Sequence, residues 1–442
     1  MIFEIGYAMT FPLPTGNFSY YYDSAQTLET KVHPPANLDQ ARDSLANLGS
    51  LAGGGVNKIN KEDIWNLIIN WNIDEDVGYI FEIDIEVPEN LHDIHNELPF
   101  LPERYNNRLT PTLFNKTNYR THILNLKQAI DHGLKLTNVH KIISFTQKRW
   151  LKDYIEFNTK KRANTNDENM RNFYKLMNNA VYGKTMENIF KRYKSLIINV
   201  NDHFKIKKLI QTKKIDEMIS ISKNLAIAKS KLIPIFDKPI YIGFCILEIS
   251  KHHMYFILYD VIKVKWNSSK LLYMDTDSFV LNINQNFHDV DYKGFEHIFD
   301  LSGYDKNSNK YNKTNKGILG TLKDEFASSK VVKFICLRSK CYIVVLNNGR
   351  IIIKNKGISG NSSDTLCVED FENILENKID KINTDQYSIK SFNHRLFTIK
   401  YSKKCLTNDP DFKRSAYINQ SNNYNDKTRY ETKALGHYKI KN

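Results

Sequence analysis

The feature that most constrains the fold is a short acid-bearing turn between two apolar runs, at residues 270–283. We expect a strand, a tight turn and a second strand from KLLYMDTDSFVLNI, because Asp and Ser favour turns and the flanking residues favour sheets. Asp275 and Asp277 would face opposite sides of a regular strand, but a turn lets them converge. Two close carboxylates repel unless a cation neutralises them, and Mg²⁺ prefers such hard oxygen ligands. The turn indicates a site for two-metal phosphoryl or nucleotidyl transfer, and a plain Asp-rich turn is the alternative.

A helix with a cation, an amide and an aromatic residue on one face is the second signal. The run KLMNNAVYG spaces Lys175, Asn179 and Tyr182 at i, i+4 and i+7, which lie along one face of a helix. The cation would meet a triphosphate, while the amide and the ring would rest against a base pair. Gly183 permits close approach to the backbone, and Arg162 upstream could add a phosphate contact. An amphipathic helix with a solvated lysine is the alternative.

The charge balance favours a polyanionic partner. The 442 residues include 63 Lys and Arg against 49 Asp and Glu, a net charge of +14, which fits nucleic acid first and an acidic membrane surface second. AT-rich coding sequence would give a similar composition. Five scattered cysteines without a CxxC pair argue against disulfides and zinc, and favour a reducing compartment. Without a signal peptide or a membrane-spanning apolar run, we expect a soluble intracellular protein with no membrane partner.

Blocks of strand and helix patterns alternate along the chain and indicate an α+β fold. Residues 77–87 alternate strictly and predict a strand, residues 148–189 predict helices, and residues 331–353 predict further strands. Residues 239–264 read as a strand that becomes a long apolar helix. The lysine-free stretch 32–57 is interpreted as a surface insertion or a flexible loop, with sequence of foreign origin as the alternative. His92 and His95 have an H-x-x-H spacing for which we expect a surface or capping role rather than a metal site.

Taken together, these motifs resemble the family-B DNA polymerases, in particular the protein-primed type of viruses, linear plasmids and mobile elements. KLMNNAVYG is similar to the family motif K-x3-N-S-x-Y-G, with Ala180 where Ser is usual. YMDTDS matches Y-x-D-T-D-S without departure, and LRSKCY, which ends at Tyr342, resembles the later K-x-Y motif. The order and rough spacing of the motifs agree over nearly the whole chain.

The resemblance implies a role for each matching residue. Two Mg²⁺ ions would be held at the acidic turn, the incoming dNTP on the helix, and the primer–template DNA near the K-x-Y motif. The implied residues are Asp275 and Asp277 for metal and catalysis; Lys175 for catalysis and, with Arg162, for the triphosphate; Asn179, Tyr182 and Gly183 for the nascent base pair; and Lys340, Tyr342, Arg338, Tyr273 and Thr276 for the primer and DNA.

The start of the chain departs from the family pattern. GYAMTFPLPTGNF resembles the segment after the first catalytic motif, D-x-x-x-L-Y-G, and aligning Gly6 places that Asp before Met1. Ile5 then takes the position of the Tyr that screens against ribose, and Glu4, the nearest acid, stands at the wrong offset. The expectation is a chain that lacks one metal-bridging carboxylate and the N-terminal exonuclease domain. Loss of a metal ligand costs orders of magnitude in rate.

The implied architecture is a right-hand polymerase with an antiparallel palm sheet. Its expected parts are palm at 1–20 and 196–330, a palm insertion resembling a terminal-protein-binding region at 21–145, fingers at 146–195, and thumb at 331–442. The implied function is DNA-directed DNA synthesis, in which a terminal protein could supply the first hydroxyl. The alternatives are a polymerase remnant that binds DNA without extending primers, and a different metal-dependent nucleotidyl transferase.

Overall fold

The structure is a computed structural model of the chain. It describes residues 2–5, 13–23, 61–212, 215–232, 235–285, 290–327, 329–392, 395–419 and 429–440, and it describes the first two of these ranges through their backbone. The insertion expected at residues 32–57 lies outside the described residues. None of the described helices is long and apolar enough to cross a membrane. All five cysteines are free thiols.

A five-stranded sheet carries the acidic turn, in the order β11–β12–β1–β14–β13. Its strands are β1 (Ile2–Ile5), β11 (Lys270–Asp275), β12 (Ser278–Asn282), β13 (Phe299–Asp300) and β14 (Leu322–Asp324). The strand, turn and strand predicted at residues 270–283 are confirmed. The pairs are antiparallel except for β13 and β14, which run parallel, so the prediction of a wholly antiparallel sheet is wrong at this edge.

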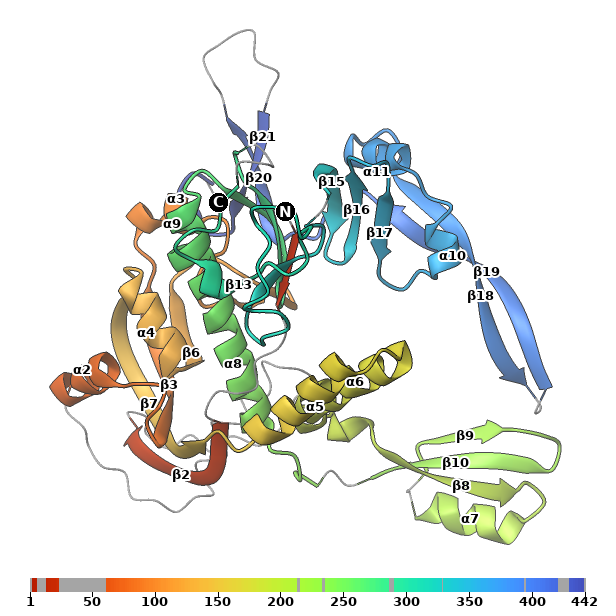
Figure 1. Ribbon diagram of the computed structural model, residues 1–442. Helices are drawn as coiled ribbons and strands as arrows, with labels where there is room; N and C mark the ends of the chain where they lie inside the picture. Colours follow the sequence, from red (N-terminus) through yellow and green to blue (C-terminus); the bar gives the residue numbers. More distant parts are fainter. Residues whose placement is uncertain are drawn as a thin grey trace.

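A four-stranded sheet forms the second layer (Figure 1). Its order is β2 (Leu13–Asp23), β7 (Lys135–Lys148), β3 (Val77–Glu86) and β6 (Lys116–His122). Strand β3 confirms the strand predicted at 77–87, whose buried and half-buried residues alternate over most of its length. Because β2 pairs with β7, residues 13–20 belong to this sheet. The prediction that residues 1–20 form part of the acidic-turn sheet is therefore wrong for residues 13–20. The same layer includes α2 (Lys61–Asn70), α3 (His92–His95), α4 (Ile123–Asp131) and the small hairpin β4 (Glu103–Tyr105) and β5 (Arg108–Thr110).

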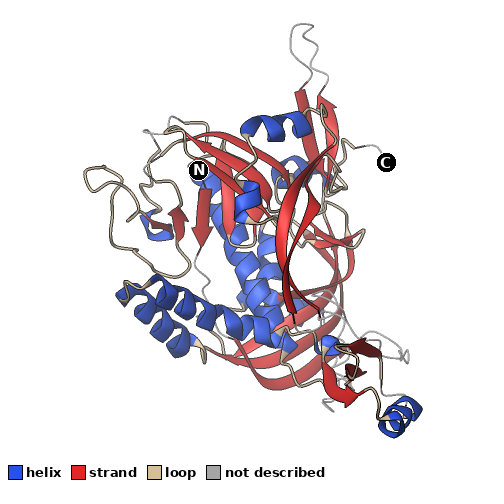
Figure 2. Ribbon diagram, turned by 90° about the vertical axis from the view of Figure 1, so that its right-hand side faces the viewer, coloured by secondary structure: helices blue, strands red, loops and turns tan. Residues whose placement is uncertain are grey.

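The central helix α8 (Ile240–Phe256) runs between the two sheets (Figures 1 and 2) and continues through the π-helical turn η3 (Ile257–Ile262) into α9 (Lys263–Lys265). The strand predicted at the start of residues 239–264 is therefore wrong. Residues are buried on nearly every side of α8, so its sequence lacks the apolar stripe that distinguishes a helix from a buried strand. A Cβ at position 243 would clash with Met186 and Thr185. Because Gly243 has no Cβ, the end of α6 can pack closely against α8.

A buried glutamate fastens the second layer to α8. Glu248 is 1% exposed, and its carboxylate accepts hydrogen bonds from Thr121 Oγ1 at 2.9 Å, Asn125 Nδ2 at 2.7 Å and the His122 backbone N–H at 3.3 Å. Lys251 is its ion-pair partner. An unpaired buried carboxylate would cost several kcal/mol, so these donors fix the position of the β6–α4 junction on α8.

Two helices and a small separate module follow the second layer. The helices predicted at residues 148–189 are confirmed as α5 (Lys152–Asn164) and α6 (Glu168–Thr185). After the short turn η2 (Ile189–Lys191), the strands β8 (Tyr193–Asn199), β9 (Glu217–Ser220) and β10 (Leu225–Lys231) form their own sheet with α7 (His203–Gln211). Residues 193–231 thus stand apart from the acidic-turn sheet, contrary to the single unit predicted for 196–330 (Figure 1).

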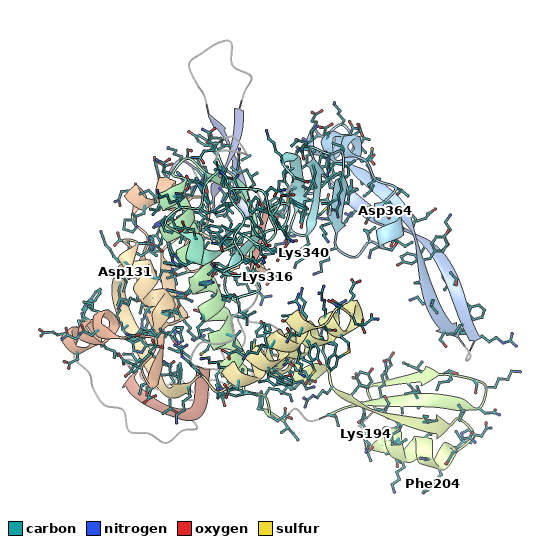
Figure 3. All side chains as sticks on the ribbon, viewed as in Figure 1. Asp131, Lys194, Phe204, Lys316, Lys340 and Asp364 are labelled. Atoms are coloured by element: carbon teal, nitrogen blue, oxygen red, sulfur yellow. The ribbon has the colours of Figure 1, made fainter. Side chains whose placement is uncertain are left out.

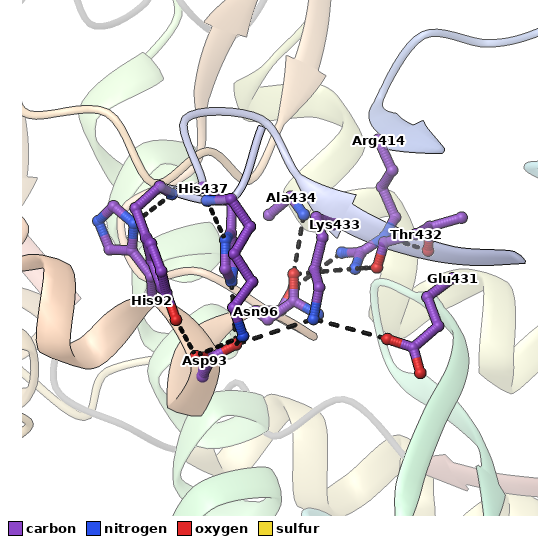
Figure 4. A network of polar contacts seen from close by, with 11 residues as sticks. His92, Asp93, Asn96, Arg414, Glu431, Thr432, Lys433, Ala434 and His437 are labelled. Atoms are coloured by element: carbon purple, nitrogen blue, oxygen red, sulfur yellow. Dashed lines mark hydrogen bonds and ion pairs between the residues drawn. The ribbon is translucent and has the colours of Figure 1, made fainter. Parts of the chain in front are cut away.

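The C-terminal residues form two separately packed parts. The first contains β15 (Val331–Arg338), β16 (Cys341–Leu346), β17 (Ile351–Asn355), α10 (Gly360–Ser363), α11 (Val368–Leu375) and the long hairpin β18 (Lys381–Phe392) and β19 (Arg395–Thr407). The strands predicted at 331–353 are confirmed. The second part, β20 (Arg414–Asn419) and β21 (Arg429–Ala434), leads into a tail that lies on α3 (Figure 4).

The tail covers His92, one of the two histidines of α3. Asp93 accepts hydrogen bonds from Tyr438 Oη at 2.7 Å and Lys439 Nζ at 3.2 Å, and His92 Nδ1 accepts one from the Tyr438 backbone N–H at 3.1 Å (Figure 4). The hydrogen bond from Tyr438 is the main cause that lowers the pKa of Asp93 to about 2. His92 and His95 are 5% and 2% exposed, so the predicted surface role is wrong: the tail and neighbouring aromatic rings cover them.

Candidate active site

The acidic turn is held in a strained backbone conformation. Thr276 has φ +51°, which is unfavourable for a β-branched residue and is seen mainly where surrounding contacts enforce it. The Asp277 backbone N–H donates to the Asp275 carbonyl at 2.5 Å, and Ser278 Oγ donates to the same oxygen at 3.2 Å. The exposed Thr276 hydroxyl lies 3.4 Å from Asp275 Oδ1. These contacts fix both aspartates at the end of the hairpin.

The first strand of the chain lies beside the turn. Glu4 pairs with Ser278 on one side and with Lys323 on the other, and Ser278 pairs in turn with Asp275. Directly paired residues stand at one level of a sheet, so the backbones of Asp275, Ser278, Glu4 and Lys323 form one row across it. The strand register places the Glu4 backbone one strand away from the acidic turn.

The K-x-Y motif packs directly on the turn. Lys340 stands in the tight connection between β15 and β16 with φ +60°. Its Nζ lies 2.8 Å from Asp275 Oδ2, and its backbone N–H donates to Tyr273 Oη at 3.0 Å. The rings of Tyr273 and Tyr342 are 5.3 Å apart. Four residues that the sequence assigned to metal and primer binding therefore make direct contact.

Charge and burial shift two groups in this cluster. The hydrogen bond to Asp275 is the main cause that raises the pKa of Lys340, so this ammonium is firmly charged at neutral pH. Burial is the main cause that raises the pKa of Tyr273, so its hydroxyl is protonated and can also donate. Arg338 ends β15 beside them, half-buried, with its backbone carbonyl 3.4 Å from Cys336 Sγ. The site thus has a fixed cation against one of its two carboxylates.

Helix α6 carries the second predicted group of residues. Asp167 caps it by accepting the Asn169 backbone N–H at 2.9 Å. Lys175 and Asn179 are exposed on the helix, whereas Tyr182 is half-buried against the apolar cluster of α8, and this burial raises its pKa. A Cβ at Gly183 would meet nothing within 4 Å. No crowding inside the described chain requires a glycine at that position.

Helix α5 packs against α6 and carries Arg162. Tyr154 Oη donates to the Met177 carbonyl at 3.3 Å, and the side chain of Asn178 donates to Thr159 Oγ1 at 3.3 Å. Within the described residues, neither Lys175 nor Arg162 is paired with a carboxylate. The structure therefore brings the predicted triphosphate ligands onto one helix pair but into no direct contact with the acidic turn.

Apolar packing connects this helix pair with the acidic-turn sheet. Tyr182 and Leu319 pack against the same α8 cluster, and the next residue, Gly320, accepts a hydrogen bond from His253 Nε2 on α8 at 2.7 Å. Strand β14 then begins at Leu322, opposite Ile5. The C-terminal end of α6 is thereby held near the end of the sheet at which the acidic turn lies.

The chemistry of the site suits a hard divalent cation. Asp275 and Asp277 supply two carboxylates, and the ion pair with Lys340 demonstrates that this position stabilises positive charge. In the described part of the chain, no three His, Cys, Asp or Glu side chains converge to hold a metal.

Sequence reasoning missed two features of the site. The contact between Lys340 and Asp275 joins residues 65 positions apart, and no local pattern announces it. The position of the Glu4 backbone could have been reached by treating IFEI as a strand, since Ile and Phe favour strands.

The fold is similar to that of phi29 DNA polymerase in solved structures. The ternary complex of phi29 DNA polymerase with primer–template DNA and incoming nucleotide is similar with a TM-score of 0.54 at 13% identity, over 92% of this chain. Its binary complex with primer–template DNA gives a TM-score of 0.50 at 13% identity, over 91% of this chain. The chain spans 57% of the length of the phi29 polymerase chain in both comparisons. The fold is therefore the α+β fold of a DNA polymerase.

Part of the sequence matches a known family. The family described as DNA polymerase type B, organellar and viral, matches residues 57–263. No curated protein matches the chain. Residues 57–263 are thus similar to the type B DNA polymerases of the organellar and viral kind, and the fold agrees with this similarity.

Proposed function

We propose that this chain catalyses template-directed transfer of nucleotides from dNTPs to a primer 3′-hydroxyl. One observation carries the proposal: within a polymerase fold, the carboxylate of Asp275 is in direct contact with the Lys340 turn, at 2.8 Å. This contact joins the residues that would perform the chemistry to those that would hold the primer end. A chance Asp-rich turn has no reason to acquire such a partner from a distant part of the chain.

The architecture supports an assignment of parts. We assign the acidic-turn sheet to the palm, α5 and α6 to the fingers, and the unit from β15 to β19 to the thumb. The four-stranded sheet with α2, α3 and α4 would be the palm insertion, and the module at residues 193–231 a second one. The support is the shared fold and the order of these units along the chain.

The reaction requires one bond to form and one to break. The primer 3′-hydroxyl loses its proton to solvent, and its oxygen forms a bond to the α-phosphorus of the dNTP. The bond between the α-phosphorus and the bridging oxygen breaks, and pyrophosphate leaves. Lys175, with Arg162, would offset the charge of the triphosphate and of the leaving pyrophosphate. Asn179, Tyr182 and Gly183 would line the pocket of the new base pair.

Asp275, Asp277 and Glu4 would hold the divalent cations. When bound, Mg²⁺ would make the 3′-hydroxyl more acidic and offset the charge on the transferred phosphoryl group. Lys340 and Tyr342, supported by Tyr273, would orient the primer end in front of the carboxylates. Arg338 and Thr276 stand next to this group and would contact the adjoining DNA backbone.

Protein priming would use the same site. A Ser, Thr or Tyr hydroxyl of a terminal protein would replace the primer 3′-hydroxyl for the first nucleotide. The four-stranded sheet and its helices occupy the segment in which protein-primed relatives carry their terminal-protein-binding region. The proposal that this layer binds a terminal protein rests on the resemblance of the motifs.

A polymerase remnant that binds DNA without extending primers is the second candidate. The observation that favours it is the pair of carboxylates at the acidic turn, where the described side chains provide no third. The position of Glu4 favours catalysis, because its backbone is paired with Ser278.

Primer extension with Mg²⁺ decides between the two candidates. We expect the wild-type chain to extend a DNA primer on a DNA template, and Glu4→Gln to lower the rate by about 10²-fold or more while primer–template affinity stays within about twofold. Binding without extension by the wild-type chain would support the remnant. Equal extension on RNA and DNA templates would instead favour a different nucleotidyl transferase.

A further inference from the structure

The connection between β13 and β14 is rich in lysine. We define the lysine loop as residues 302–320, which contain four lysines and a single acid, Asp305. Lysine is abundant throughout this chain, so the number alone carries no weight. What distinguishes the loop is how it is built and where the fold places it.

Buried polar groups fix the course of the loop. The Asp300 carboxylate, 7% exposed, accepts the backbone N–H of Ser302 at 3.0 Å and that of Gly317 at 3.1 Å, which closes the loop at both ends. The side chain of Asn315 donates to the backbone carbonyls of Glu296 at 2.7 Å and Phe299 at 3.1 Å. The lysines are therefore presented from a defined frame, so binding would cost little loop-ordering entropy.

The sheet topology brings the loop to the acidic turn. Because β13 and β14 are parallel, the chain must return along the sheet before β14 begins, and it enters β14 at Leu322, opposite Ile5. That is the end of the sheet at which Glu4 pairs with Ser278. The last loop residues contact α8, where Gly320 accepts the hydrogen bond from His253. In the view of Figure 3, Lys316 lies between the sheet and the α5–α6 pair, as Lys340 does.

Three of the four lysines carry unneutralised charge. Lys306, Lys313 and Lys316 are exposed, and no described carboxylate forms an ion pair with them. The fourth, Lys310, lies 5.7 Å above the ring of Tyr304. Like charges on one loop repel one another, and a bound polyanion offsets this charge while it releases its own counterions.

We propose that the lysine loop is a binding surface for the phosphate backbone of DNA beside the acidic turn. Lys306, Lys313 and Lys316 supply the phosphate contacts. The inference rests on the proposed function, since it takes the DNA at the acidic turn as the ligand. Lysine acts as a point charge without base readout, so this surface holds the DNA independently of its sequence.

Salt titration of primer–template affinity tests the proposal. The triple variant Lys306→Ala, Lys313→Ala and Lys316→Ala should lower the slope of log affinity against log salt by about 2, because each lost phosphate contact removes about 0.7–0.9. The matched control changes three cations of the second layer, Lys61→Ala, Arg104→Ala and Lys135→Ala, and should change the slope by less than about 1. A triple Lys→Arg variant of the loop should retain the wild-type slope, because the charge is kept.

The outcomes separate this inference from the proposed function. If the alanine loop variant retains the wild-type slope, or if the arginine variant loses it as well, the loop does not act through charge on phosphates and the proposal is overturned. If the wild-type chain binds no primer–template at low salt, the proposed function fails and this inference with it. Binding with the expected change of slope but without primer extension overturns only the catalytic part of the proposed function.

Discussion

The acidic turn and the α5–α6 pair differ in how far their predicted site residues are already engaged. At the turn, Asp275 contacts Lys340, and Tyr273 contacts both the Lys340 backbone and the ring of Tyr342. On the helix pair, Lys175 and Arg162 are exposed and have no carboxylate partner among the described residues. A preorganised cluster suits the reacting centre, where reorganisation would raise the barrier. Unpaired cations suit a part that a charged substrate completes.

The largest expected loss of activity follows from a substitution at the acidic turn. Asp275→Ala should reduce primer extension by about 10³-fold or more, because it removes a carboxylate from the cation site. Single-turnover extension at saturating dNTP measures this. The control is Asp131→Ala, an exposed acid at the end of α4, which should stay within about twofold of wild type. Unchanged extension by Asp275→Ala would contradict the assignment of the acidic turn as the reacting centre.

A substitution on the α5–α6 pair should mainly weaken the binding of dNTP. Lys175→Ala should raise the KM for dNTP by about tenfold and lower kcat/KM by about 10–100-fold, since one charge–phosphate interaction of about 1.5–3 kcal/mol is lost. Its free energy of unfolding should stay within about 0.5 kcal/mol, because the side chain has no partner to lose. Steady-state kinetics and urea unfolding provide the two measurements. Lys160→Ala on α5, also exposed, is the matched control. A Lys175→Ala variant that loses stability but keeps its KM for dNTP would show that Lys175 has a structural role and does not bind the triphosphate.

The four-stranded sheet layer contains a buried histidine, His122 at the end of β6, which should make the stability of the chain sensitive to acid. Burial lowers the pKa of His122 to about 4, while its Nδ1 accepts the Leu124 backbone N–H at the start of α4. The unfolded chain, with a histidine pKa near 6.5, binds more protons than the folded chain between about pH 6.5 and 4. Stability from this group is therefore complete above about pH 6.5 and is lost as the pH falls towards 4.

The variant His122→Asn tests this linkage. Asparagine can still cap α4 but does not titrate, so the loss of stability between about pH 7.5 and pH 5 should shrink by about 2 kcal/mol. Urea unfolding at the two pH values measures the difference. The same loss in both proteins would exclude His122 as a cause. His95, whose pKa is also lowered to about 4, mainly by burial, remains in the variant as an internal reference.

The smallest expected effect is the change in stability on substitution of Gly183 in α6, and it tests the assignment of this helix to the base-pair pocket. Gly183→Ala should stabilise the chain by about 0.4–1 kcal/mol, because the glycine is helical and a Cβ there would meet nothing within 4 Å. If a base pair approaches this position, the same change should lower primer extension by about tenfold. Thermal unfolding and extension assays measure the two effects. A more stable variant with unchanged activity would contradict the assignment of Gly183 to the base-pair pocket.

Local patterns predicted the elements that carry the motifs. The hairpin at residues 270–283, the strand at 77–87 and the helices α5 and α6 are confirmed, because turn chemistry and hydrophobic period are properties of neighbouring residues. The same reasoning failed at α8. A helix that is buried on nearly every side has no polar face, and its period is hidden in the sequence.

Other features depend on residues far apart in the chain. The separate module at residues 193–231 and the C-terminal tail on α3 have no local signal, because the partner of each strand is chosen by packing. His92 and His95 illustrate the consequence, since their spacing gives no sign that Tyr438 covers the first and that Phe100 and Tyr259 cover the second.

The sequence by itself determined which residues we propose for the chemistry: the acids at 275 and 277, the face of Lys175 and Asn179, and the Lys340–Tyr342 motif. Only the tertiary structure decided that Lys340 faces Asp275 and that the Glu4 backbone stands beside the acidic turn. The physical reason is one of range. Turn, strand and helix preferences act over a few residues, whereas strand register and ion pairing between distant segments follow from how the whole chain buries its apolar surface.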